Sequence, residues 1–238
     1  MGFGTGLAPL LFVFGYSPLE IVPVLLLSET LTGLIAGVVH HDVDNVTFSL
    51  RPLNAETRLL GLLVGVGAGA AFTSVLLAYF AIGLSDWLIE TYVSVLVMAM
   101  GVIGLARARL RTFEYRPRRL VAFALLAGVN KGIGGGGYGP VVTLGQILSG
   151  VYEKSAVAIT TLTEGIVSIT GVIAFGYLVT RGVSVDLHLF PSIFAGGFLA
   201  ALVAPYLVRV LPNTLWRYLI PVYALGIGVA GLLLSFSV

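Results

Sequence analysis

Two glutamates lie inside apolar segments of this chain. An ionised side chain in such surroundings has a high free-energy cost, so these two residues are candidates for a functional role. Glu164 lies 11 residues after Glu153, the expected start of its helix, and Glu29 lies 11 residues after Pro18. At 1.5 Å per residue this is about 16 Å along a helix, near the centre of a bilayer. Each carboxyl must then be protonated, paired or turned toward a cavity. It is either a proton-coupling or gating group, or a structural carboxyl bonded to backbone amides.

A glycine-rich run precedes each glutamate. The second run reads G-V-N-K-G-I-G-G-G-G-Y-G-P from Gly128 to Pro140, and the first reads G-F-G-T-G-L-A-P from Gly2 to Pro9. Glycine costs a helix about 1 kcal/mol relative to alanine, so such runs predict loops that unwind and then restart as a helix at the proline. The free N–H groups of a helix start can bind an anion. Close helix packing is the alternative, but the second run is richer in glycine than packing requires, which favours a pore-lining loop.

Two more polar side chains belong to this set of candidates. Lys131 precedes the second run and has no counterpart in the first. It either attracts an anion or pairs with Glu164, or else extends to the membrane interface. Thr160, Glu164 and Ser168 share one helix face, which we expect to point into the bundle. The candidate substrate-binding or gating residues are Gly4, Gly6, Pro9, Glu29, Lys131, Gly134, Gly135, Gly136, Gly137, Pro140, Thr160 and Glu164.

Other glycines have the spacing of helix-packing seams. Gly33 and Gly37 follow Glu29 at four-residue intervals, which indicates close packing of that helix. We also expect a structural seam of small residues at Gly61, Gly65 and Gly69.

The composition is that of a multi-pass protein of the cell (plasma) membrane. Hydrophobic residues make up 58% of the 238 residues, charged residues only 10%, and the mean hydropathy is +1.03. A soluble domain has about 25% charged residues. The partners we expect are the lipid bilayer and a small anionic substrate. The net charge of +2 does not indicate nucleic acid, because the cations lie beside the apolar segments. The sequence leaves the oligomeric state open.

No constellation of catalytic or metal-binding residues is apparent. The chain has no cysteine, and its three histidines, His40, His41 and His188, lack the spacing of a metal site. We therefore expect no enzymatic activity, no cofactor and no metal. No ATP-binding motif is visible either, so an ion or substrate gradient must supply the energy of any transport.

The apolar pattern predicts an all-α polytopic membrane protein, a two-repeat helical bundle of about 7–8 membrane segments with glycine-rich broken or re-entrant elements. Two segments, 3–16 and 119–150, are too short or too interrupted to be regular continuous helices. Six segments are long enough to span a bilayer: 18–39, 57–80, 87–106, 156–180, 187–208 and 215–237.

Recurring landmarks divide the chain into a first half, 1–105, a basic cytoplasmic linker, 106–118, and a second half, 119–238. If 119–150 crosses the membrane, three basic residues of the second half lie opposite the linker. If it is re-entrant, they lie on the linker side and only Arg181 lies opposite, which charge bias favours; the halves are then inverted repeats. The three residues are Lys154, Arg209 and Arg217.

The chain resembles the TauE/SafE family of sulfite or organosulfonate transporters. The resemblance is carried by Gly134 to Pro140, by the segment from Ala156 to Glu164, and more weakly by the run from Gly2 to Pro9. The resemblance implies movement of small sulfur-containing anions. In the first run, Thr5 stands where the second has Gly136, so the first loop is expected to be less open. The apolar stretch 119–131 also has no equivalent before Gly2, so either the first element is a half-helix or the native start lies upstream.

The leading hypothesis is a secondary transporter, an exporter of small anions such as sulfite or organosulfonates, that works by alternating access with proton coupling. A passive anion channel and a non-transporting membrane scaffold or assembly factor are the alternatives.

Overall fold

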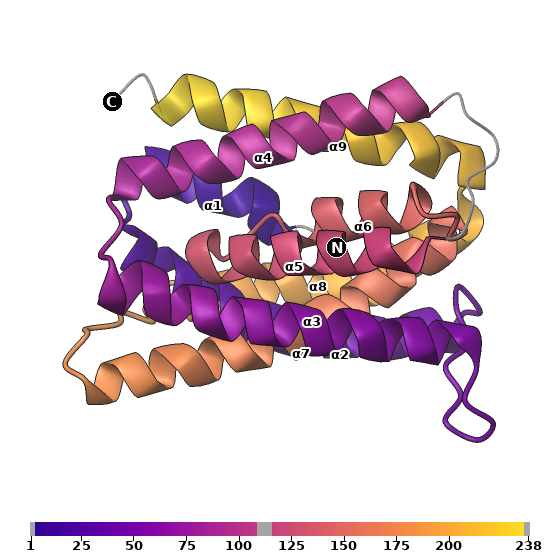
Figure 1. Ribbon diagram of the computed structural model, residues 1–238, viewed down its shortest axis with the longest axis horizontal. Coiled ribbons are helices and arrows are strands. Elements are labelled where there is room, and N and C mark those ends of the chain that lie inside the picture. Colours follow the sequence, from indigo (N-terminus) through magenta and orange to yellow (C-terminus); the bar gives the residue numbers. More distant parts are fainter. Residues whose placement is uncertain (1–2, 109–115, 236–238) are drawn as a thin grey trace.

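A computed structural model describes residues 3–108 and 116–235, and this part of the chain is helical without β-strands (Figure 1). Six helices are long and apolar enough to cross a membrane, which confirms the predicted all-α, multi-pass architecture. They are α2 (Pro18–Asp42), α3 (Ala55–Leu76, continued by a π-helical turn over Leu77–Ala81), α4 (Asp86–Arg107), α7 (Glu153–Thr180), α8 (Phe190–Val210) and α9 (Asn213–Ser235).

The second glycine run breaks its segment into two helices, α5 (Pro117–Gly134) and α6 (Tyr138–Ile147). Gly135 and Gly137 adopt φ values of 69° and 79°, a region that glycine enters without a Cβ clash. The helix restarts at Tyr138, which puts Pro140 in the first turn of α6.

The first glycine run behaves differently. It forms a continuous helix, α1 (Phe3–Val13), so the prediction that this run unwinds up to its proline was wrong. Only Gly4 and Gly6 fall within α1, on either side of Thr5. The helix stability lost through two isolated glycines is smaller than the stabilisation that tertiary packing supplies.

The segment 117–150 enters and leaves the bundle at the same end. Lys154 Nζ donates a hydrogen bond to the carbonyl oxygen of Arg209 (2.8 Å), and Arg209 Nη1 donates to that of Asp44 (3.2 Å). The start of α7 therefore lies beside the end of α2. Because α3 and α4 each cross the bundle once, the end of α4 also lies there. The pair α5 and α6 must then go in and come back to the same end of the bundle.

The same end of the molecule holds the remaining basic residue of the second half. Arg217 Nη2 pairs with Glu153 Oε1 at 2.6 Å, which joins the starts of α9 and α7. Arg181, which follows α7, lies at the opposite end. Lys154, Arg209 and Arg217 thus lie at one end of the bundle and Arg181 at the other. Much of the linker, 109–115, lies outside the described residues.

Helices α2 and α7 cross the centre of the bundle antiparallel and in close contact. A Cβ on Gly33 would lie 2.7 Å from Gly165 Cα, and one on Gly37 would lie 2.7 Å from a methyl carbon of Leu162. The close packing predicted for Gly33 and Gly37 is therefore confirmed. Backbones that approach this closely carry side chains at equivalent depth on the two helices into the same region.

The seam predicted at Gly61, Gly65 and Gly69 was wrong, because a Cβ at any of these positions would meet no atom. The face of α3 that packs closely contains Gly67 instead. A Cβ on Gly128 of α5 would lie 2.5 Å from the carbonyl oxygen of Gly67, so α5 rests directly on α3. Figure 1 shows the two helices side by side, with α4 and α9 forming a separate pair at the edge.

Candidate functional site

A cluster of three charged side chains is buried where α2, α5 and α7 meet. Lys131 of α5 is fully buried, and its ammonium contacts Glu29 Oε2 of α2. The same Nζ lies 3.5 Å from Glu164 Oε1 of α7. Of the roles considered for Lys131, extension to the membrane interface is excluded, and pairing is observed with both glutamates.

The charges of this cluster do not balance when all three groups are ionised, since two carboxylates face one ammonium. An uncompensated charge taken out of water costs several kcal/mol, so the electrically neutral form carries one proton on a carboxyl. Glu29 Oε1 is buried and has no hydrogen-bond partner among the described residues. The cluster therefore keeps two carboxyl groups and one ammonium together away from water.

The second glycine run is fastened to α1 beside this cluster. The Gly137 amide donates a hydrogen bond to Thr5 Oγ1 (2.7 Å), and Asn130 Nδ2 donates to the carbonyl oxygen of Gly136 (3.0 Å). A Cβ on Gly136 would lie 2.6 Å from the carbonyl oxygen of Gly4, and one on Gly4 would strike the Glu29 carboxylate. The glycines therefore allow α1, the loop and Glu29 to approach one another closely.

The other residues singled out from the sequence occupy different surroundings. Gly134, Gly135 and Pro140 are buried, in or beside the same loop. Gly6 faces the Tyr223 and Ile227 side chains of α9. Pro9 belongs to α1, and its side chain is outside the described part.

Thr160 holds α6 against α7 and does not contact the charged cluster directly. Its Oγ1 accepts a hydrogen bond from Gln146 Nε2 (2.7 Å) and another from the Thr143 hydroxyl (3.0 Å). The predicted polar face of α7 is therefore buried, but its residues interact with different helices: Thr160 bonds to α6, and Glu164 pairs with Lys131 of α5.

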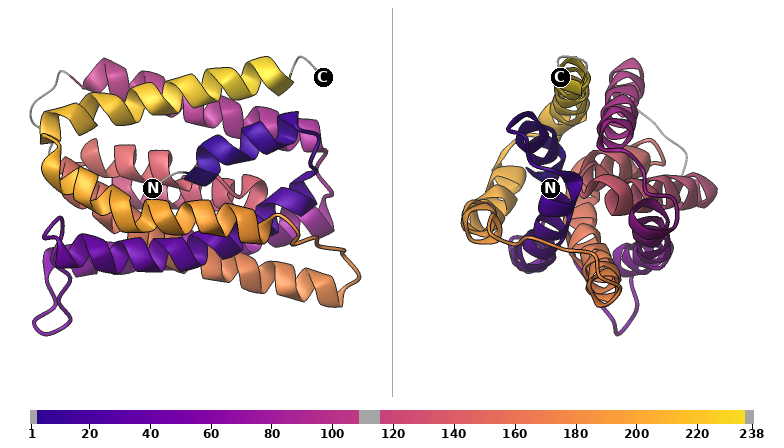
Figure 2. Two further views of the ribbon diagram at one scale, coloured as in Figure 1. Left: turned by 180° about the vertical axis from the view of Figure 1, so that it is seen from behind. Right: turned by 90° about the vertical axis from the view of Figure 1, so that its left-hand side faces the viewer.

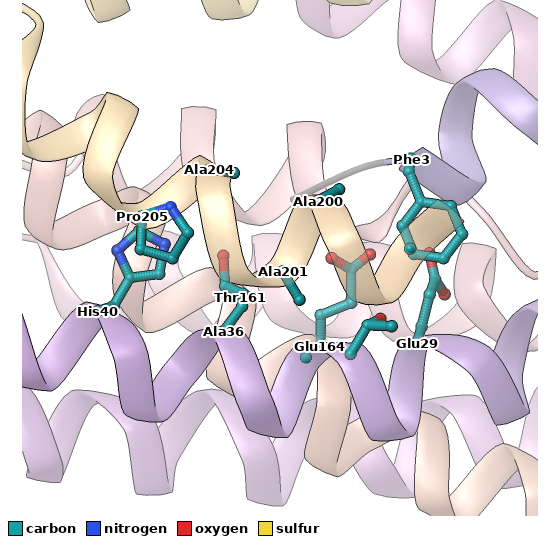
Figure 3. A pocket seen from close by; sticks show the side chains of 13 residues that line it. Phe3, Glu29, Ala36, His40, Thr161, Glu164, Ala200, Ala201, Ala204 and Pro205 are labelled. Atoms are coloured by element: carbon teal, nitrogen blue, oxygen red, sulfur yellow. The ribbon is translucent and has the colours of Figure 1, made fainter. Parts of the chain in front are cut away.

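A cavity of about 130 Å³ lies between α2, α7 and α8 and reaches both carboxylates. Figure 3 shows Glu29 and Glu164 directed into it, with Phe3 above Glu29 and His40 at the far end. Lys131 is not among its lining residues, so the carboxylates stand between the cavity and the ammonium. The α8 wall is formed by Pro205 and by four small residues, Gly197, Ala200, Ala201 and Ala204. None of the residues Gly134–Gly137 lines this cavity.

The sequence analysis missed the histidine and the α8 wall. His40 lies 11 residues after Glu29, about three helical turns, which puts both on one face of α2. That spacing is a signal that could have linked them. The wall residues of α8 follow an i, i+3, i+4, i+7 pattern of small side chains, which identifies a face but not what lies against it.

The match to known proteins covers nearly the whole chain. A family model described as "Sulfite exporter TauE/SafE" matches residues 1–231. The chain belongs to the TauE/SafE family. It is also similar to the "Probable membrane transporter protein YtnM" of Bacillus subtilis (strain 168), with 26% identity over 224 residues, which covers 88% of this chain and 68% of that protein. No solved structure matches it. The protein is thus a multi-pass member of a membrane transporter family.

Proposed function

We propose that this TauE/SafE protein is a proton-coupled secondary transporter that exports a small anion, sulfite or an organosulfonate, by alternating access. The observation that carries the proposal is a fully buried lysine held between two glutamates at the wall of a cavity. The substrate class comes from the name of the family model. Direction and coupling rest on the basic residues at one end of the bundle and on the charge of the cluster.

The coupling follows from the charge of the cluster. With one carboxyl protonated, Lys131, Glu29 and Glu164 sum to zero. An anion that reaches the Lys131 ammonium brings the sum to −1, and a second proton restores neutrality. Since a net charge at this depth is costly, each monovalent anion should bind together with about one proton. The protonated carboxyls would also release Lys131 from its ion pairs and donate hydrogen bonds to the substrate.

The arrangement of the helices supports alternating access. The proposed halves, 1–105 and 119–238, each contribute one glutamate, from α2 and α7, which cross antiparallel. Thr32 of α2 lies against Gly197 of α8, and Val167 of α7 lies against Gly67 of α3, so each central helix packs on a helix of the other half. Inverted halves that exchange partners in this way can rock around a central site.

The basic linker fixes the direction of entry in this proposal. The cavity extends along α2 from Glu29 toward His40, and the end of α2 lies beside Lys154 and Arg209. By the positive-inside rule this end is cytoplasmic, so an exported anion would enter there.

The test is a flux assay in proteoliposomes with sulfite, sulfate, thiosulfate and short sulfonates across an imposed pH gradient. We expect saturable flux of at least one of these anions that responds to the gradient. Glu164→Gln should abolish the pH response, whereas Glu56→Gln, outside the cluster at the start of α3, should leave it unchanged. Flux that does not saturate would favour a channel, and no flux with any of the anions would favour a scaffold. Equal pH responses in both variants would remove the coupling role of Glu164.

A further inference from the structure

His40 lies at the end of the cavity opposite Glu29 and is almost completely buried, with 2% of its surface exposed. It belongs to the last turn of α2, close to the loop that we assign to the cytoplasmic side. Figure 3 shows its ring beside Pro205 of α8, with Thr161 and Glu164 between it and Glu29. The burial of this imidazole is not explained by the charged cluster, because Glu29 lies at the other end of the cavity.

The hydrogen bonds around His40 determine which ring nitrogen carries the proton. Asn45 Nδ2 lies 2.8 Å from the carbonyl oxygen of Pro205, and because that oxygen can only accept, the amide nitrogen of Asn45 must face it. The same Nδ2 lies 2.9 Å from His40 Nδ1 and donates to it. Nδ1 is therefore the unprotonated nitrogen, and the hydrogen of the neutral ring resides on Nε2.

Asn45 also keeps this ring neutral in the resting arrangement. A second proton on Nδ1 would face the amide hydrogen of Asn45 across 2.9 Å. His40 is thus held as a donor of one hydrogen bond, through Nε2, rather than as a site that exchanges protons.

The rest of the cavity lining offers acceptors and apolar groups. Thr161 donates its hydroxyl hydrogen to the carbonyl oxygen of Val157 (2.9 Å), and Thr32 donates its own to that of Ser28 (2.9 Å). The wall of α8 offers only glycine, alanine and proline side chains. Apart from a protonated carboxyl, His40 is the one side chain among the described lining residues with a hydrogen still to donate.

We propose that His40 Nε2–H is an anion-binding group, which receives a small oxyanion at the cytoplasmic end of the cavity before it reaches Lys131. The inference rests on the proposed function, because it adds a second anion-binding site to the same transport pathway. Along α2, His40 is about 16 Å from the level of Glu29, so a small anion cannot contact His40 and Lys131 at once. A fixed, neutral donor binds an oxyanion without the cost of a second buried cation.

The test compares His40→Gln, which keeps an N–H donor, with His40→Leu, which has a similar size and no donor. Hydrogen bonds to charged groups contribute strongly, so the half-saturating anion concentration should rise by about tenfold to a hundredfold in His40→Leu. His40→Gln should stay within a few-fold of the wild type. Binding of sulfite and of a short sulfonate to the purified protein, by calorimetry, should show the same order of affinity.

Asn45→Asp gives an independent readout. Its carboxylate would accept a hydrogen bond from Nδ1–H, which leaves Nε2 without hydrogen in the neutral ring. Anion affinity should then fall as pH rises, with a midpoint absent from the wild type. The other charged groups near this end, Asp44 and Arg209, and the cavity carboxylates Glu29 and Glu164 are the same in both proteins. They supply the background pH profile for the comparison.

The outcomes separate this inference from the proposed function. If the wild type transports an anion and His40→Leu does so with unchanged half-saturation, His40 only clamps α2 to α8 and the inference is overturned alone. Both variants would then lose thermal stability without a change in affinity. If the wild type neither binds nor transports any of the anions, both proposals fail.

Discussion

The faces of α3 and α8 that look toward the central helices have the same pattern of small residues and opposite uses. On α3 the pattern is Gly67, Ala70, Ala71 and Ser74, and on α8 it is Gly197, Ala200, Ala201 and Ala204. Helix α5 fills the first face, with Gly128 against Gly67 and Ala70 and Gly132 against Ala71 and Ser74. The second face lines the cavity (Figure 3), and Figure 2 shows α8 running alongside α2.

This difference shows that a stripe of small residues permits close approach of another group but does not determine which group packs there. Helix α5 packs on the α3 face and thereby positions Lys131 beside the two glutamates. On the opposite side the glutamates face open space. In the proposed cycle the filled side supplies the fixed cation and the open side admits protons and substrate.

The largest effect should come from removing the cation that the filled side supplies. Lys131→Met leaves two buried carboxylates without a partner, and breaking a buried ion pair costs about 3–5 kcal/mol. We expect a large drop in the thermal unfolding temperature of the detergent-solubilised protein and flux no higher than in protein-free liposomes.

The double variant Lys131→Met with Glu29→Gln separates stability from function. It should recover part of the lost stability, because one of the stranded charges is gone, and still transport nothing. Anion flux through either variant at the wild-type rate would show that Lys131 is only structural.

A smaller effect should distinguish the two faces directly. Ala71 on α3 and Ala201 on α8 occupy matching places in the two stripes, and both are buried. Ala71→Leu pushes against α5 and should cost about 1–3 kcal/mol of unfolding free energy. Ala201→Leu extends into the cavity, so it should leave stability nearly unchanged and reduce anion flux strongly.

Thermal unfolding and flux, measured on both variants, check this pair. If the two substitutions destabilise the protein equally, the α8 face is as tightly packed as the α3 face. Unchanged flux in Ala201→Leu would show that the substrate does not pass through the cavity.

The sequence was sufficient for the features that depend on local composition. The six long apolar segments appear as six long helices, and Gly135 and Gly137 break the interrupted one. Pairing of Lys131 with Glu164 was one of three hypotheses, because the sequence does not determine how α5 is rotated about its axis. Its contact with Glu29, 102 residues away, depends on where Gly128 and Gly132 set α5 on α3.

The errors have the same origin. Gly61, Gly65 and Gly69 share one helix face, but a Cβ there would contact no atom of the described residues, and Gly67 on another face makes the close contact. The first glycine run is helical because α1 packs against the second run, where Thr5 accepts the Gly137 amide hydrogen. Helical periodicity predicts faces, whereas the choice of partner for each face is a property of the whole bundle.

The central claim is that protons accompany the anion through the Lys131 cluster. The most direct measurement records anion flux and internal pH together in proteoliposomes that contain a trapped pH indicator. For the wild type we predict about one proton moved per monovalent anion, in the same direction, and for Glu164→Gln no proton movement linked to the anion. Anion flux through the wild type without proton movement, or with protons moving in the opposite direction, would contradict the account.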